Sequence, residues 1–277
     1  MKAVHKVPDL RQALSGLNGT VGFVPTMGAL HAGHLSLVER CRRECDVVVV
    51  SVFVNPTQFN DRNDLKNYPR TPEKDLALLE GAGVDVAFLP GVEDVYPQED
   101  TRRFDFGPVE RVMEGPLRPG HFNGVGQVVS RLFDLVKPHR AYFGEKDFQQ
   151  VAVIRELVRQ LRMPVEIVAC PIRRDADGLA LSSRNALLNP AQRKAAPHIY
   201  RTLCEAAEFA NRKSIPELCR WVRERIDENP ELETEYFEVV DGRTLQPAAD
   251  WKGEHGRYGC VAVRVGEIRL IDNIKLC

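Results

Sequence analysis

The segment Pro25-Thr26-Met27-Gly28-Ala29-Leu30-His31-Ala32-Gly33-His34 decides the fold expected for this chain of 277 residues. It follows a short apolar run at 21–24 and leads into apolar residues at helical spacing over 33–45. We therefore expect a turn from a buried strand into a helix, where backbone N–H groups can hold phosphate. His31 and His34 share one face of the helix start, so both can donate hydrogen bonds to a phosphoryl group in its transition state. The alternative is that the two histidines only cap the helix or pack in the core. The two glycines and the preceding strand favour the phosphate-binding role.

Strands and helices alternate through the first part of the chain. We expect strands in 21–24, 46–54, 84–89, 141–143 and 165–170, and helices in 33–45, 71–80, 124–136 and 148–161. Strands separated by helices of this length imply right-handed crossovers and a parallel sheet.

The pattern changes beyond Arg173. We expect helices in 191–211 and 215–228 and strands in 236–240, 258–264 and 267–271. The predicted fold class is α/β, a Rossmann-like doubly wound parallel sheet in residues 1–174, with a smaller α+β C-terminal domain in residues 175–277.

The composition shows no excess of positive charge. Lys and Arg number 38 against 39 Asp and Glu, a net charge of −1, whereas nucleic-acid-binding proteins are usually basic. We therefore expect no nucleic-acid partner, and attraction for phosphate has to come from locally placed cations. The longest apolar run, 47–54, is too short to cross a membrane. The first ten residues lack the apolar core of a signal peptide.

The seven cysteines form no CxxC pair. Cys41 and Cys45 lie one helical turn apart, which could supply half a metal site, but no His or Cys at ligand spacing completes it. Reduced structural thiols are therefore expected, and with them a cytoplasmic location.

The string His31-x-Gly33-His34 resembles the HxGH signature of nucleotidylyltransferases and class I aminoacyl-tRNA synthetases. The longer string 25–34 closely resembles the pantothenate synthetase (pantoate–β-alanine ligase) family. The resemblance spans nearly the whole chain. Its other strings are Ser51 to Phe59, Asp64-x-x-x-Tyr68-Pro69-Arg70, Arg118-Pro119-Gly120-His121-Phe122-x-Gly124-Val125, Gly144-Glu145-Lys146-Asp147, Asp177 to Asn185 and Tyr236 to Asp241.

The resemblance implies that (R)-pantoate and β-alanine are condensed with ATP, through pantoyl adenylate, to give pantothenate, AMP and pyrophosphate. Its implied ATP-binding residues are Met27, Gly28, Ala29, Leu30, His31, Ala32, Gly33, His34, Gly144, Glu145, Lys146, Asp147, Arg173, Leu181, Ser182, Ser183 and Arg184. The implied catalytic residues are His34 first, then His31, Lys146, Ser182, Ser183 and Arg184. Pantoate and β-alanine are assigned to Asn55, Gln58, Arg118, His121 and Gln150. Mg²⁺ is expected to be bridged chiefly by ATP oxygens, with Asp147 as a protein group that could reach it, and the resemblance suggests a homodimer.

Each assignment also has a structural alternative. Asn55 could serve only turn chemistry before Pro56, the loop 118–125 could be a tight helix entry, and Ser182 could cap a helix in an interdomain linker. Two departures from the family strings are notable: the loop 60–63 lacks the usual glycine, and Arg173 stands where an aliphatic residue is usual.

Three other functions share some of these features. A nucleotidylyltransferase that forms no amide shares the HxGH string and the fold class. A tRNA synthetase relative would need a basic, anticodon-binding extension. A catalytically inactive binding protein would have no reason to keep both histidines together with Lys146 and the 182–184 string.

Overall fold

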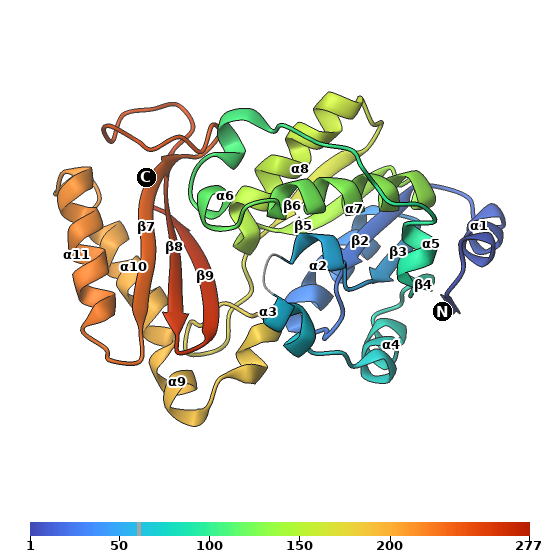
Figure 1. The fold of residues 1–277 in the computed structure, drawn as a ribbon, viewed down its shortest axis with the longest axis horizontal. Helices are drawn as coiled ribbons and strands as arrows, with labels where there is room; N and C mark the ends of the chain where they lie inside the picture. Colours follow the sequence, from blue (N-terminus) through green and yellow to red (C-terminus); the bar gives the residue numbers. More distant parts are fainter. Residues whose placement is uncertain (60–61) are drawn as a thin grey trace. The chain divides into compact units, whose positions relative to one another are not determined.

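The computed structural model describes residues 1–59 and 62–277 (Figure 1). Asn60 and Asp61, part of the departure in the 60–63 loop, lie outside the described residues. The chain divides into two compact units. The first contains 1–106, 118–145 and 150–171, and the second contains 107–117, 146–149 and 172–277. The sequence does not anticipate that 107–117 and 146–149 belong with the C-terminal part. The division into a Rossmann-like domain at 1–174 and an α+β C-terminal domain at 175–277 stays a prediction.

A parallel sheet forms the centre of the first unit. Its six strands among the described residues are β1 (Lys2–Val4), β2 (Val21–Thr26), β3 (Val47–Val52), β4 (Val86–Phe88), β5 (Arg140–Gly144) and β6 (Glu166–Cys170). Their order is β1-β4-β3-β2-β5-β6, and every pair is parallel. The predicted strands 46–54 and 84–89 are real but shorter at both ends.

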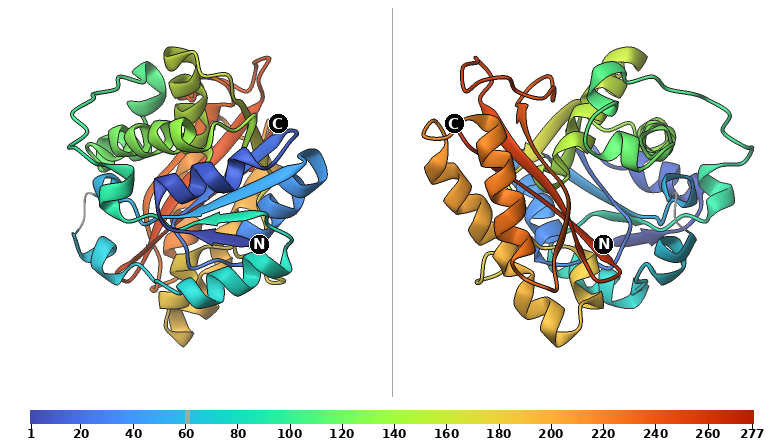
Figure 2. Two further views of the ribbon diagram at one scale, coloured as in Figure 1. Left: turned by 90° about the vertical axis from the view of Figure 1, so that its right-hand side faces the viewer. Right: turned by 60° about the vertical axis from the view of Figure 1, so that its left-hand side comes forward.

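Helices cover both faces of this sheet (Figures 1 and 2). One face carries α2 (Ala32–Glu44) and α4 (Pro72–Gly81), whose apolar side chains pack on those of β2, β3 and β5. The other carries α1 (Val7–Ser15), α7 (His121–Val136) and α8 (Phe148–Leu161), with Phe133 of α7 set edge-on against Phe23 and Phe143. Between these elements lie α3 (Arg62–Asn67), α5 (Val92–Val95) and short 3₁₀ turns that include η1 (Pro56–Gln58).

The strand order reverses beside β2. The chain runs from β2 to β3 on one side, and later returns to β5 on the other side of β2. Ligands of open parallel sheets bind outside the carboxyl ends of the strands at such a reversal. The topology therefore places the turn after β2 where a ligand is expected.

An antiparallel sheet of β7 (Glu233–Asp241), β8 (Arg257–Val265) and β9 (Ile268–Lys275) forms the second unit. Helices α10 (Pro197–Phe209) and α11 (Ile215–Asp227) lie on one face of this sheet, as Figure 2 shows. Their apolar side chains share one core with those of the strands. The segment 107–117 joins this unit through Glu114, which is 6% exposed and pairs with Arg269 at 2.7 and 2.8 Å. This segment contains η2 (Gly107–Glu110) and α6 (Glu114–Leu117).

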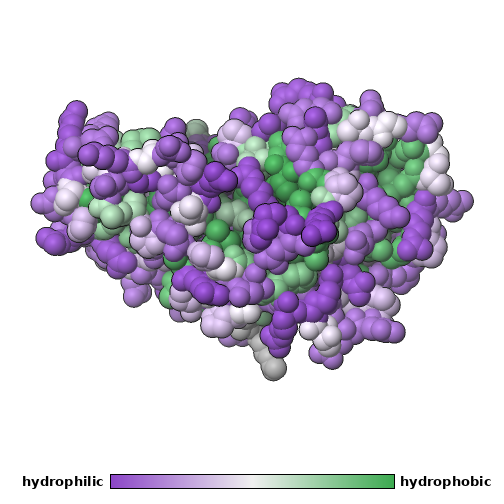
Figure 3. All heavy atoms as spheres, turned by 90° about the horizontal axis from the view of Figure 1, so that it is seen from above, coloured by the Kyte–Doolittle hydropathy of each residue, from purple (hydrophilic) through white to green (hydrophobic). Residues whose placement is uncertain are grey.

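The predicted fold class is confirmed, with one helix predicted wrongly. The single helix expected over 191–211 is two helices, α9 (Pro190–Ala195) and α10, because Pro197 cannot continue a helix but suits the first position of the next one. The sequence reading also missed β1 and α1. Within the described residues, no helix is long and apolar enough to cross a membrane. Hydrophilic residues cover most of the face drawn in Figure 3.

Candidate active site

The turn after β2 is fixed by backbone geometry. Thr26 donates its hydroxyl to the Ser51 carbonyl at 2.7 Å and accepts from the Gly28 N–H at 3.3 Å. Gly28 has a φ of +81°, and a Cβ there would lie 3.0 Å from the Asp75 carboxylate. The site therefore requires glycine at this position, both for its left-handed backbone and for the close approach of Asp75.

Asp75 of α4 holds this turn in place. Its carboxylate is 1% exposed and accepts the backbone N–H of Ala29 at 2.9 Å and of Leu30 at 2.8 Å. Ala29 has a φ of +50°, which is uncommon for a residue with a side chain. Thr71, which is the N-cap residue of α4, donates its hydroxyl to the same carboxylate at 3.1 Å, and its side chain accepts no capping hydrogen bond from the helix backbone. Sequence reasoning missed Asp75, although a carboxylate on the apolar stripe that contains Leu79 was the available signal.

His31 and His34 cap the start of α2 reciprocally. The His31 Nδ1 accepts from the Gly33 N–H at 3.1 Å, and the His34 Nδ1 accepts from the His31 N–H at 3.4 Å. The two rings lie 4.1 Å apart between centroids. Because each Nδ1 is an acceptor, the proton of each neutral ring is assigned to Nε2, which makes Nε2 a hydrogen-bond donor. Capping was the structural alternative for this pair, and here it is what sets the tautomers.

The backbone N–H groups of this turn are mostly used within the protein. Those of Gly28, Ala29, Leu30, His31 and Gly33 donate to side chains of the protein. This differs from the expectation that the turn presents its N–H groups to phosphate. The two imidazole rings at this turn carry a further donor each, the Nε2–H group.

Asn55 and Gln58 form a second polar group at the end of β3. Asn55 is 1% exposed and donates to the Gln58 Oε1 and to the Gly124 carbonyl, both at 3.2 Å. Its own Oδ1 accepts from the Tyr96 hydroxyl at 3.0 Å, and burial raises the pKa of Tyr96, which keeps that donor protonated. Gln58 donates its Nε2 to the Met27 sulfur at 3.0 Å. The predicted residues Met27, Asn55 and Gln58 therefore lie together, with Gln58 bonded to both of the others and Asn55 buried.

The loop before α7 is tied to the same corner. His121 is the first residue of α7, is 7% exposed, and its Nδ1 bonds the Gln58 carbonyl at 2.8 Å. Its Nε2 lies 3.2 Å from an Arg118 nitrogen. His121 thus contacts the Gln58 backbone, and Arg118 contacts His121. Gln150 lies in α8, directly after the buried Gln149, which bonds the backbone of 107–117.

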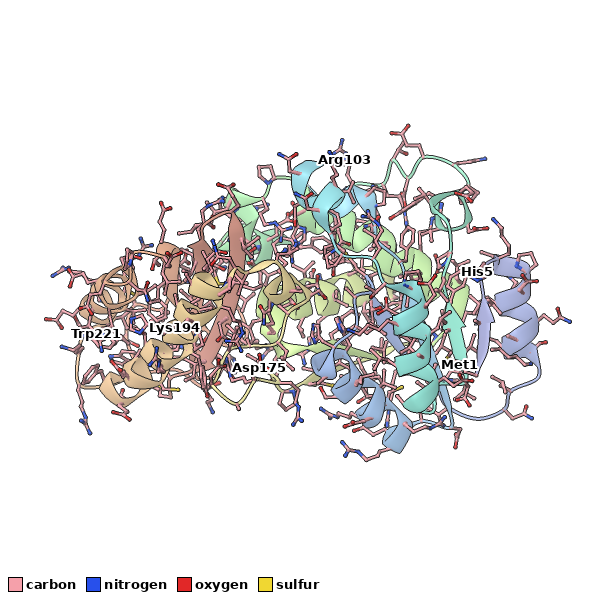
Figure 4. The ribbon with its side chains drawn as sticks, turned by 90° about the horizontal axis from the view of Figure 1, so that it is seen from below. Met1, His5, Arg103, Asp175, Lys194 and Trp221 are labelled. Carbon is pink, nitrogen blue, oxygen red and sulfur yellow. The ribbon has the colours of Figure 1, made fainter. Side chains whose placement is uncertain are left out.

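In the second unit, the predicted phosphate-binding residues gather around a turn at 173–181. The Leu181 N–H donates to the Arg173 carbonyl at 2.9 Å, and Asp175, labelled in Figure 4, lies within the turn. Ser182 caps the 3₁₀ turn η4 (Ser183–Leu187) by accepting from the Arg184 N–H at 3.3 Å. A small pocket of this unit is lined by Lys146, Leu179, Ala180, Ser182, Ile199, Leu270, Ile271 and Asp272. Lys146 and Ser182 thus share one pocket.

Gly144 ends β5, and Glu145, Lys146 and Asp147 form the 3₁₀ turn that follows it. The Lys146 ammonium lies 3.7 Å from an Asp147 carboxylate oxygen, and the Asp147 side chain is 46% exposed. No group of three or more His, Cys, Asp or Glu side chains that could hold a metal occurs in the part of the chain that the structure describes.

Comparison with known proteins decides the family. The family model described as pantoate-beta-alanine ligase matches residues 2–275. The chain belongs to the pantoate–beta-alanine ligase family. Members of this family are ligases, so the enzyme class predicted from the sequence is confirmed.

Individual relatives match over nearly their full length. A pantothenate synthetase of Bacteroides fragilis is 56% identical, with 99% of each chain covered. The crystal structure of pantothenate synthetase from Thermus thermophilus matches with a TM-score of 0.94 at 51% identity, covering 100% of this chain and 99% of the other. A pantoate-beta-alanine ligase from Francisella tularensis, complexed with beta-gamma ATP and beta-alanine, matches with a TM-score of 0.85 at 34% identity over 100% and 98% of the two chains.

Proposed function

We propose that this chain condenses pantoate with β-alanine, using ATP, through a pantoyl-adenylate intermediate. Membership of the pantoate–beta-alanine ligase family supports the overall reaction, and the ligands named for the Francisella relative support ATP and β-alanine as substrates. The observation that carries the mechanism is the capped pair His31 and His34 at the reversal of strand order, with Nε2 of each ring as donor.

In the first half-reaction, a pantoate carboxylate oxygen attacks the α-phosphorus of ATP, and the bond to pyrophosphate breaks. Negative charge grows on the phosphoryl oxygens as this happens. The Nε2–H groups of His34 and His31 stabilise that charge as fixed hydrogen-bond donors. Lys146, Ser182, Ser183 and Arg184 neutralise the charge on the departing pyrophosphate. Gln58, held by Asn55 and by the Tyr96–Asn55 hydrogen bond, positions pantoate through neutral groups.

In the second half-reaction, the β-alanine amine attacks the acyl carbon of pantoyl adenylate. The bond between the acyl carbon and the AMP oxygen breaks, and AMP leaves with that oxygen. The attacking NH₂ group loses one proton to solvent and keeps the other as the amide N–H. No protein nucleophile takes part. The protein holds the two reactants in contact and keeps water from the adenylate until the amine enters.

Magnesium fits this scheme as an ion carried by ATP. Mg²⁺ commonly keeps several waters and binds nucleotide phosphates with only one or two carboxylates of the protein. Asp147, whose carboxylate is about half exposed, would supply such a ligand. When bound, the ion would supply positive charge at the phosphates.

The chain works as a homodimer in the cytoplasm under this proposal. The dimer rests on the family resemblance, and the cytoplasmic location rests on seven cysteines that are all free. The mass of the protein in solution, measured by light scattering, tests the dimer.

The adenylate makes a specific prediction for the oxygen atoms of pantoate. With ¹⁸O in both carboxylate oxygens, one labelled oxygen must end in AMP and one in the amide carbonyl of pantothenate. We expect one ¹⁸O per AMP by mass spectrometry, only when β-alanine is also present. Label found in inorganic phosphate, with ADP as the nucleotide product, would replace the adenylate by an acyl phosphate.

A further inference from the structure

Two successive polar side chains on β9 are almost completely buried. Asp272 is 6% exposed and Asn273 is 5% exposed. Burying such groups costs free energy unless they are hydrogen-bonded, so their partners indicate what they do. Successive side chains of a strand point to opposite faces, so the two residues reach different parts of the second unit.

Asp272 holds the turn that leads into the predicted phosphate loop. Its carboxylate accepts two hydrogen bonds from Arg174, at 2.6 and 2.9 Å, and this bidentate geometry fixes the guanidinium in one plane. The same guanidinium donates to the Gly178 carbonyl at 3.2 Å and lies 3.5 Å above the Tyr200 ring. Arg174 also pairs through its backbone with Ala180 across the turn. The Arg174–Asp272 ion pair therefore fixes the turn at 173–181, and Ser182 is the next residue after this turn.

Asn273 holds the backbone of Lys146. Its Nδ2 donates to the Lys146 carbonyl at 3.2 Å, and its own N–H donates to the Asp272 carboxylate at 2.8 Å. The Lys146 side chain is 18% exposed, so it is confined by its surroundings. Two neighbouring residues of β9 thus hold two parts of the second unit. Asn273 bonds the Lys146 backbone, and Asp272 bonds Arg174 in the turn before Ser182.

We propose that Asp272 and Asn273 form a positioning pair, which sets the separation between Lys146 and the loop Ser182–Arg184. Lys146, Ser182 and Asp272 line one pocket, so the groups that the pair holds do meet. Neither residue of the pair is a catalytic residue, because each acts through another. The inference rests on the proposed function, in which the held groups neutralise the departing pyrophosphate.

A positioning role predicts different effects on the two half-reactions. Formation of the adenylate needs the pyrophosphate-binding groups, whereas attack of β-alanine on a preformed adenylate does not. A purely structural role for the pair would affect both half-reactions alike. The test therefore compares pantoate-dependent ATP–pyrophosphate exchange with the release of AMP from chemically prepared pantoyl adenylate by β-alanine.

The variants are Asn273→Ala and Asp272→Asn, with Arg174→Lys in case Asp272→Asn fails to fold. The matched control is Asp241→Asn, which weakens another ion pair of the same sheet, from Asp241 to the buried Arg257 at 2.9 Å. We expect the exchange rate of each of the three variants to fall about tenfold or more, because small misplacements of positioned groups are costly. The rate of AMP release from the preformed adenylate should stay within about twofold of wild type, and the control should keep both rates.

Equal loss of both half-reactions in the folded variants, or wild-type exchange in Asn273→Ala, would overturn the positioning role. Absence of pantoate-dependent exchange in the wild-type protein would overturn the proposed function, and the positioning role with it. The two failures are therefore distinguishable by the wild-type protein alone.

Discussion

The Nδ1 atoms of His31 and His34 accept backbone hydrogen bonds at the start of α2. Two roles that looked like alternatives in the sequence therefore belong to different atoms of the same rings. Capping fixes the ring orientation and the tautomer, and under the proposed function Nε2–H is the donor to the phosphoryl group. An isolated histidine in a mobile loop would lack this preorganisation.

Asp75 gives the first prediction at this scale. Asp75→Asn keeps the shape of the side chain but removes its charge and replaces one acceptor oxygen by an NH₂ group, facing the N–H groups of Ala29 and Leu30. We expect the free energy of unfolding in urea to fall by about 1–3 kcal/mol. The exchange rate should fall at least about tenfold, because the turn before His31 relaxes. Glu73→Gln, at an exposed position of the same helix, is the matched control. A destabilised variant with full exchange activity would show that Asp75 serves stability alone.

The sequence contained the residue types of the site but not their partners. His31, His34 and Gln58 follow strand ends, so topology alone predicts that they meet at one edge of the sheet. Asp75 accepts the N–H of Ala29, which lies 46 residues earlier in the chain. Asp272 pairs with Arg174, which lies 98 residues earlier. Such contacts depend on the tertiary fold and have no local pattern in the chain.

Secondary structure was predictable where periodicity was strong. The strands β2, β3 and β6 and the helices α2, α4, α8 and α11 arise from apolar runs or apolar spacing, and the sequence locates all of them. β1 is only three residues long, which is too short for a period to show, and α1 follows it. The break between α9 and α10 was overlooked because the apolar spacing continues across Pro197, although proline at that point begins a new helix.

Strand β7 gives a prediction of pH dependence. Burial raises the pKa of Glu238, and Arg223 opposes this only in part. Because the folded-state pKa lies above the unfolded value, stability is fully present below the unfolded pKa and is lost as the pH rises through the folded one. Glu238→Gln should therefore raise the midpoint of thermal unfolding at pH 7. The gain in the midpoint over the wild-type protein should vanish at about pH 4, below the ordinary glutamate pKa.

Calorimetry over this pH range checks the prediction. Glu233→Gln, at an exposed position of the same strand, should change the midpoint little at any pH. A lower midpoint for Glu238→Gln at pH 7 would mean that the attraction of the Arg223 charge outweighs the cost of burying Glu238.

The whole molecule has nearly balanced charge, −1 over 277 residues. It cannot attract ATP by its net field, so recognition of phosphate depends on groups placed by the fold. The chain passes between its two compact units more than once. The segments 107–117 and 146–149 could not be assigned to the second unit from sequence, because Glu114 and Gln149 hold them through contacts with distant residues or backbone.

Pantoate-dependent ATP–pyrophosphate exchange without β-alanine tests the central claim most directly. The wild-type protein should incorporate labelled pyrophosphate into ATP only when pantoate is present. His34→Ala should lose about a hundredfold or more of this rate, as expected for removal of a donor to a developing oxyanion. His5→Ala, at an exposed histidine labelled in Figure 4, should keep it. No exchange in the wild-type protein, or undiminished exchange in His34→Ala, would contradict the adenylate mechanism proposed for the His31–His34 corner.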